Sequence, residues 1–264
     1  MNNATGAALQ DFVDEESVHR ACAELRFAEA LRRRSEEART EASVQEGALL
    51  AWLEGARGSA SELRELSMRP AKEFEVAASD PAMAVALGTW QAAWRLQSEL
   101  PPLNEGVATF SQGRSAPAVL ATLNRDVLSP LVRSGSIPLE QVAIPQDPAT
   151  MTRVLQLASG TGGSVLTRTA TVLRLLLTQP VFPHGNVATA FLFARWLLVS
   201  SGVEPTGVAL LSHYASQNPN QFAALREAGT EEQWRAFALA SVGQGARAGM
   251  IVARSVQAGK PLGL

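Results

Sequence analysis

Apolar residues recur at helical spacing along most of the chain, with polar residues between them. Residues 165–178 are strongly apolar, and residues 186–200 are almost continuously apolar, which is typical of helices buried on several sides. Residues 14–35 and 36–55 instead alternate charges of both signs among Ala and Leu, as on a solvated helix face. The pattern predicts an all-α fold.

Capping signals divide this pattern into separate helices. Asp80-Pro81 and Asp147-Pro148 each combine an N-cap residue with proline at the first helical position. The pattern of residues 117–133 predicts a further helix, bent or interrupted near Pro130. Thr230 predicts the start of the last helix, which extends to about residue 258.

Two loops interrupt the helices, at residues 101–116 and 159–164. The second loop is rich in glycine, as phosphate-binding loops are, but no Gly-Lys-Ser/Thr follows it. We therefore interpret it as a flexible connector between helices.

Composition narrows the range of functions. The 264 residues suit one large domain or two small ones, and a formal net charge of −2 gives no reason to expect nucleic-acid or membrane binding. Cys22 is the only cysteine, so an intrachain disulfide is excluded. Three histidines in total, His19, His184 and His213, argue against a metal site built on several histidines.

The chain shows no targeting pattern. It does not open with a basic segment followed by an apolar run, and the most apolar segment, residues 190–199, is about half the length that a bilayer requires. We expect a cytoplasmic protein.

The chemically most informative segment is the turn at residues 179–188, between the two apolar helices. Pro180 and Pro183 stiffen it, Gly185 permits a tight bend, and Asn186 is a favoured N-cap. The free N–H groups of residues 186–188 would then point out of the helix start, where the helix dipole also favours an anion.

This turn resembles a known active-site motif. The segment Pro180-Val181-Phe182-Pro183-His184-Gly185-Asn186-Val187-Ala188 is similar to H-P-F-x-[D/E]-G-N-G-R of the Fic (Fido) family. Phe182, Gly185 and Asn186 match, and residues 190–198 resemble the apolar helix that follows the motif. Further similarities in the last third are Ser212, Tyr214, Phe222-Ala223-Ala224-Leu225, Trp234 and Phe237.

The resemblance implies a domain organisation. The chain is expected to be a single helical domain over residues 1–264. A Fic-like core spans residues 115–258. Residues 1–114 supply N-terminal helices and a loop, residues 101–116, that corresponds by position to the family's target-docking flap.

The resemblance also implies a reaction, the transfer of AMP from ATP to a hydroxyl of a target protein. The family's general base is replaced by Pro180, which cannot accept a proton. The acid that holds Mg²⁺ is replaced by His184, although a hard cation prefers carboxylate oxygen. The phosphate-binding arginine is replaced by Ala188, and the second glycine by Val187. The residues left to bind a nucleotide or phosphate are Gly185, Asn186, Val187 and Ala188.

His184 is a candidate base or metal ligand if the chemistry is rearranged, because imidazole suits acid–base work at neutral pH. It lies four residues beyond the position that the family geometry requires. The alternative is a turn histidine that caps a helix or meets solvent.

Many members of the family carry an inhibitory helix with the motif [S/T]-x-x-x-E-[G/N]. Ser43, Glu46 and Gly47 form a near match, with the serine one position too close. The glutamate's usual arginine partner is missing at Ala188, so an ordinary surface or interhelical role for Glu46 is favoured.

Three hypotheses follow. The first is a degenerate Fic-like pseudoenzyme that acts as a binding or regulatory protein and retains at most a residual nucleotide or phosphate site. The second is an active nucleotidyl or phosphoryl transferase that uses His184, and the third is a purely structural interaction module. ATP and Mg²⁺ are cofactors only by implication of the family, and a protein partner or a homodimer remains open.

Overall fold

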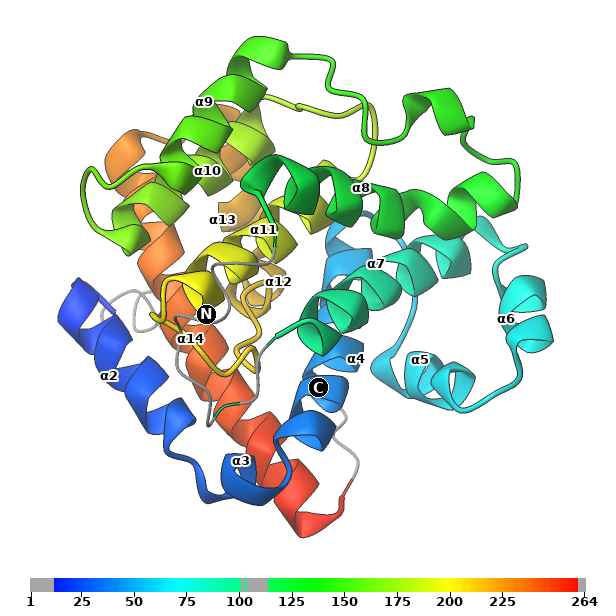
Figure 1. Cartoon of the computed structure of the whole chain (residues 1–264), viewed down its shortest axis with the longest axis horizontal. Coiled ribbons are helices and arrows are strands. Elements are labelled where there is room, and N and C mark those ends of the chain that lie inside the picture. Colours follow the sequence, from blue (N-terminus) through cyan, green and yellow to red (C-terminus); the bar gives the residue numbers. More distant parts are fainter. Residues whose placement is uncertain (1–11, 101–102, 104–113, 261–264) are drawn as a thin grey trace.

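Helices form all of the regular secondary structure that the computed structural model describes, which covers residues 12–100, 103 and 114–260 (Figure 1). The predicted all-α fold is confirmed. The elements follow one another as α2 (Glu15–Arg26), α3 (Glu29–Arg33), α4 (Ser35–Leu53), α5 (Ala60–Ser67), α6 (Ala71–Ala77), α7 (Pro81–Ser98), α8 (Ala116–Arg133), the 3₁₀ turn η2 (Leu139–Gln141), α9 (Pro148–Ser159), α10 (Val165–Thr178), α11 (Asn186–Ser200), α12 (His213–Gln217), α13 (Pro219–Ala228) and α14 (Glu231–Ala258).

The capping signals locate several helix starts correctly. The side chain of Asp80 accepts a hydrogen bond from the Met83 N–H, and Asp147 caps α9 in the same way. Thr230 forms a capping box with Gln233 at the start of α14. Pro130 lies inside α8, which nevertheless continues to Arg133.

Some local expectations are wrong. The helix expected over residues 14–35 is divided at Phe27 and Ala28, which separate α2 from α3. The short helices α5, α6 and α12 were not predicted. Most of the expected flap loop, residues 101–116, lies outside the described residues, and α8 already begins at Ala116.

The helix α11 occupies the centre of the molecule. Almost every one of its side chains is buried, and it contacts α10, α8, α4 and α7 (Figure 1). This environment explains why its sequence lacks a polar face. The turn before α11 therefore connects directly to the core.

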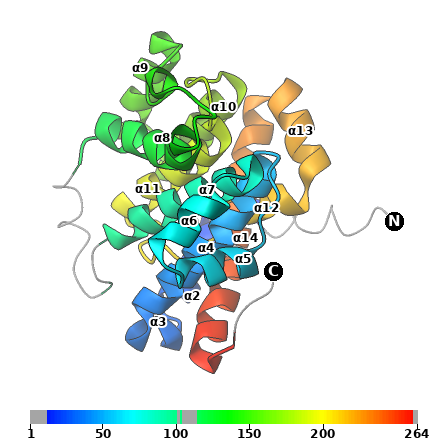
Figure 2. The same ribbon diagram turned by 90° about the vertical axis from the view of Figure 1, so that its right-hand side faces the viewer.

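The long helix α14 packs against α2, α10 and α4, and Figures 1 and 2 show it extending to the same end of the molecule as α3. Among the described residues it is the one helix whose length and apolar composition would suit a membrane span. Of its apolar window, 72% is buried inside the protein, and a core helix meets the same criterion.

Buried apolar side chains form two clusters among the described residues. The larger cluster draws on helices from α2 to α14. The smaller cluster lies between α4, α5 and α7, with Leu63 and Trp90 among its members. In Figure 1, α5 and α6 lie at the side of the molecule opposite α2.

Candidate functional site

The turn between α10 and α11 depends on Gly185. Its φ angle is +69°, in the left-handed region that side chains rarely adopt. A Cβ atom there would also lie 3.1 Å from Val127 Cγ1 and 3.2 Å from Leu128 Cδ2, both in α8. Gly185 is itself the N-cap of α11, so the expectation that Asn186 is the N-cap is wrong.

Asn186 instead fixes the shape of the turn through its side chain. Its Oδ1 accepts a hydrogen bond from the Phe182 N–H at 3.0 Å, and its Nδ2 donates to the Phe182 carbonyl at 2.7 Å. The ring of Phe182 is completely buried. The asparagine and phenylalanine shared with the Fic motif thus form one structural unit.

A second asparagine holds the turn from α8. Asn124 is completely buried, and its Nδ2 donates to the His184 carbonyl at 2.9 Å. Its Oδ1 accepts from the Ala143 N–H at 2.9 Å, at a residue whose φ angle is +57°. Asn124 was not among the predicted site residues, although a lone amide among the apolar positions of residues 117–133 was a usable signal.

The start of α11 is already occupied by a carboxylate of the same chain. Glu54, the C-cap residue of α4, accepts a hydrogen bond from the Ala188 N–H at 2.9 Å through its Oε1. The expectation of a free N–H at Ala188 is therefore wrong. A carboxylate takes the place that the helix dipole offers to an anion.

Burial raises the pKa of the Glu54 carboxyl group above its ordinary value. Hydrogen bonds from the Ala188 and Val187 N–H groups, and the charges of Arg226 and His184, oppose this shift but do not cancel it. Two effects therefore oppose each other at the Glu54 carboxyl group. Burial disfavours its charged form, and the N–H groups at the start of α11 stabilise that form.

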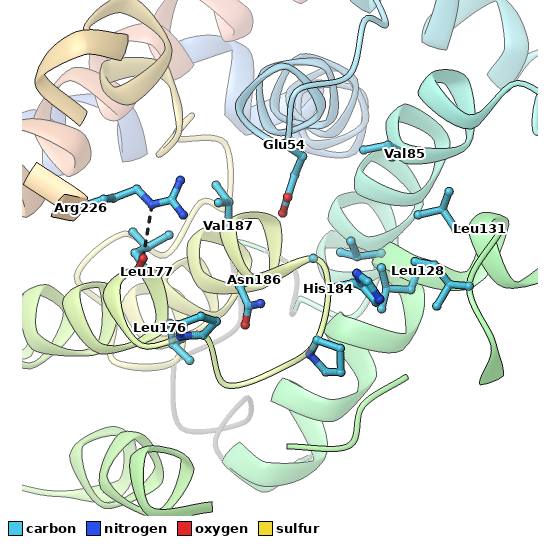
Figure 3. Close-up of a pocket in the computed structure, with 15 residues that line it drawn as sticks. Glu54, Val85, Leu128, Leu131, Leu176, Leu177, His184, Asn186, Val187 and Arg226 are labelled. Atoms are coloured by element: carbon cyan, nitrogen blue, oxygen red, sulfur yellow. Dashed lines mark hydrogen bonds between the residues drawn. The ribbon is translucent and has the colours of Figure 1, made fainter. Parts of the chain in front are cut away.

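A cavity of about 350 Å³ opens beside this contact (Figure 3). Aliphatic side chains and proline rings form most of its wall, and Glu54, His184, Asn186 and Arg226 supply polar groups. The remaining lining residues are Val85, Val127, Leu128, Leu131, Ile137, Leu176, Leu177, Pro180, Pro183, Gly185 and Val187.

Glu54 and His184, the two candidate proton acceptors of the cavity, lie in different surroundings. His184 is exposed, and its Nε2 forms a hydrogen bond with Gln141 Oε1 at 2.9 Å. Pro180 also lines the cavity. Among the described lining residues, Glu54 and His184 carry the carboxylate and imidazole groups that serve as general bases in proteins.

The residues at the turn do not fit Mg²⁺ or a nucleotide phosphate. Mg²⁺ takes oxygen ligands in octahedral geometry, whereas the described residues that line this cavity offer one carboxylate, which already accepts the Ala188 N–H. Throughout the described part of the chain, no group of three or more His, Cys, Asp or Glu side chains is arranged to hold a metal. A phosphate at the helix start would meet the Glu54 carboxylate, a like charge.

The three residues of the inhibitory-helix match lie in the interior of α4. Glu46 is completely buried, with Oε2 3.4 Å from Arg195 Nη2 and Oε1 accepting from the Ser212 N–H at 3.2 Å. Gly47 lies against Trp90, and Ser43 donates to the Thr40 carbonyl. The interhelical role expected for Glu46 is what the structure shows, and its expected surface alternative is wrong. The carboxylate of this segment that reaches the turn is Glu54.

Comparison with known proteins does not assign the chain to a family. No protein-family model matches the chain, and no curated protein sequence matches it significantly. The chemistry of the turn and its cavity is therefore the basis for assigning a function.

Proposed function

We propose that this chain is a degenerate Fic-like protein that binds a ligand or partner and does not transfer AMP to protein hydroxyls. The observation that carries the proposal is the hydrogen bond between Glu54 and the Ala188 N–H at the start of α11. It places negative charge where a nucleotide phosphate would have to bind.

The side chains around the turn support the same proposal. Hydroxyl transfer needs a base beside the nucleophile and positive charge on the phosphates. Pro180 supplies no base, and Ala188 supplies no charge. Arg226, the one arginine among the described residues that line the cavity, donates to the Leu177 carbonyl at 3.3 Å.

The scaffold of the turn is nevertheless well ordered by specific contacts. Asn186, Asn124 and Gly185 each hold the backbone through hydrogen bonds or close packing. A preformed cavity with a few fixed polar groups is typical of ligand-binding sites. Binding is therefore the activity that these residues support best.

Labelled ATP, with Mg²⁺ or Mn²⁺ and a cell lysate, tests the proposal. We expect no transfer of label to protein above the level seen without the chain. Transfer that disappears in His184→Ala, but persists in the matched exposed-histidine control His19→Ala, would contradict the proposal and favour the rearranged transferase.

Far-ultraviolet circular dichroism of both variants shows whether a loss of transfer reflects the site or the fold. A third outcome separates binding from a purely structural role. If neither nucleotides nor small ligands bind in calorimetry, the interaction-module hypothesis replaces the proposed binding function.

A further inference from the structure

The cavity beside the turn contains a carboxylate without a counter-ion. In the part of the chain that the structure describes, no basic side chain forms an ion pair with Glu54. A charge that is partly withdrawn from water is costly unless it is paired or neutralised. The arrangement leaves a place for a cation.

Arg226, the arginine among the described lining residues, is directed elsewhere. Arg226 donates from Nε to the Leu177 carbonyl, and its guanidinium lies 5.7 Å from the centre of the Phe222 ring. In Figure 3 it lies on the other side of Val187 from Glu54. Arg226 therefore contributes long-range attraction to the carboxylate without pairing with it.

The remaining wall of the cavity is suited to an apolar body. Leu128, Leu176 and Val127 are each no more than 2% exposed, and all three line the cavity. Contact with such a wall removes apolar ligand surface from water, which favours binding. An acidic group at one point of an aliphatic cavity selects a ligand that is cationic at one end and apolar elsewhere.

We propose that this cavity binds a small primary amine with an apolar body, its ammonium group on Glu54 and its body against Leu128 and Leu176. This inference rests on the binding role proposed above and names the ligand class for the same site. The N–H groups at the start of α11 hold the carboxylate in position, so little ordering is needed when the ammonium arrives.

The same electrostatics exclude the opposite ligand. A phosphate or carboxylate would face the Glu54 charge across a cavity walled mostly by apolar side chains, where like charges repel more strongly than in water. A neutral ligand of the same shape would keep the apolar contacts but lose the charge-assisted hydrogen bond. The proposal therefore predicts an order of affinity among three isosteres.

Titration calorimetry with phenylbutylamine, phenylbutanol and phenylbutyrate tests this order on the unmodified protein. We expect the amine to bind at least about tenfold more tightly than the alcohol, as a hydrogen bond to a charged group implies. We expect no measurable binding of the carboxylate. Equal affinity for amine and alcohol, or tighter binding of phenylbutyrate or ATP, would overturn the proposal.

Variants locate the ammonium group. Glu54→Gln keeps an oxygen for the Ala188 N–H and removes the charge, so amine affinity should fall to that of the alcohol. Glu227→Gln removes an exposed acid next to Arg226 that does not line the cavity, and should change amine affinity less than twofold. If Glu54→Gln binds the amine as tightly as the unmodified protein, Glu54 is not the acceptor and the proposal fails.

The two proposals fail in different ways. Loss of the amine preference leaves the absence of AMP transfer untouched, because the isosteres are tested without ATP. Label transfer to protein would contradict the proposed function whether or not the amine binds. Should Glu54→Gln melt well below the unmodified protein, the comparison of the three isosteres on the unmodified protein still decides.

Discussion

Burial and hydrogen bonding act on the Glu54 carboxyl group in opposite directions, and burial prevails. The folded protein therefore holds the proton on Glu54 at a higher pH than the unfolded chain does. Between the ordinary pKa of 4.5 and the raised one, folding takes up protons. The contribution of Glu54 to the free energy of unfolding must fall as pH rises through this window.

This sign gives a prediction for Glu54→Gln. The free energy of unfolding of the unmodified protein should decline relative to that of the variant as pH rises from 4.5 through the raised pKa. Each unit of pKa shift corresponds to about 1.4 kcal/mol. Urea denaturation at a series of pH values measures the difference.

The difference between the stability curves of the unmodified protein and Glu54→Gln isolates the contribution of Glu54 from that of other titrating groups. Burial also raises the pKa values of Glu46 and Glu204, and both residues are unchanged in the variant. The charges of His184 and Arg226 also act on Glu54, and both residues are present in both proteins. A constant difference across this pH range would show that Glu54 has an ordinary pKa.

The residues of the turn itself were accessible to sequence reasoning, whereas their partners were not. A tight bend at Gly185 and a special role for Asn186 follow from local chain chemistry. Glu54 is 134 residues from Ala188, and nothing local distinguishes it from the other acids of residues 36–55. Its role appears only when the end of α4 is brought to the start of α11.

The helices α7 and α8 approach each other closely enough that one residue position admits no side chain. A Cβ atom on Gly88 would collide with the Val127 carbonyl oxygen and lie 3.3 Å from Pro130 Cδ. A backbone carbonyl in the middle of a helix cannot rotate away. Since α8 also carries Asn124 and Leu128, this contact determines where one wall of the cavity lies.

We expect Gly88→Ala to destabilise the protein by about 1–3 kcal/mol, the usual range for overpacking. The higher helix propensity of alanine opposes this loss by roughly 1 kcal/mol. Gly162→Ala is the control, because a Cβ atom there has nothing within 4 Å. Chemical denaturation measures both variants, and equal stabilities would show that α7 and α8 are not closely packed at Gly88.

At the scale of elements, long apolar or well-capped segments were predicted best. The predicted bounds 165–178 and 186–200 coincide with α10 and α11 because strong apolar runs lie between clear turn signals. The short helices α5 and α6 have too few residues to show a period, and α6 has no side-chain cap. The formation of α6 depends on packing, in which Phe74 contacts Trp90 of α7, and local sequence does not encode such packing. The start of α5 did carry a local signal, the capping box of Ser59 and Glu62, which the sequence-based prediction did not use.

Across the whole molecule, buried charges join segments that are far apart in sequence. Arg195 of α11 is 1% exposed and donates to the Ala209 carbonyl at 2.7 Å as well as facing Glu46 of α4. Glu204, also buried, accepts a hydrogen bond from the Gly207 N–H at 3.0 Å, and the positive charge of Arg195 favours its ionised form. The helix that begins at the candidate site is thus tied to the N-terminal half by an ion pair within the core.

Removing one member of this pair should be far more damaging than removing both. Arg195→Met leaves Glu46 buried without a counter-ion, and we expect a loss of about 3–5 kcal/mol. Glu46→Leu combined with Arg195→Met removes both charges, and should recover more than half of that loss, because Glu204 keeps its donors from Thr206 and Gly207. Urea denaturation of the two single variants and the double variant gives the coupling energy. Additive losses would mean that Glu46 and Arg195 stabilise the fold independently, and α4 would then be held to α11 by apolar packing and by the Glu54 contact at the start of α11.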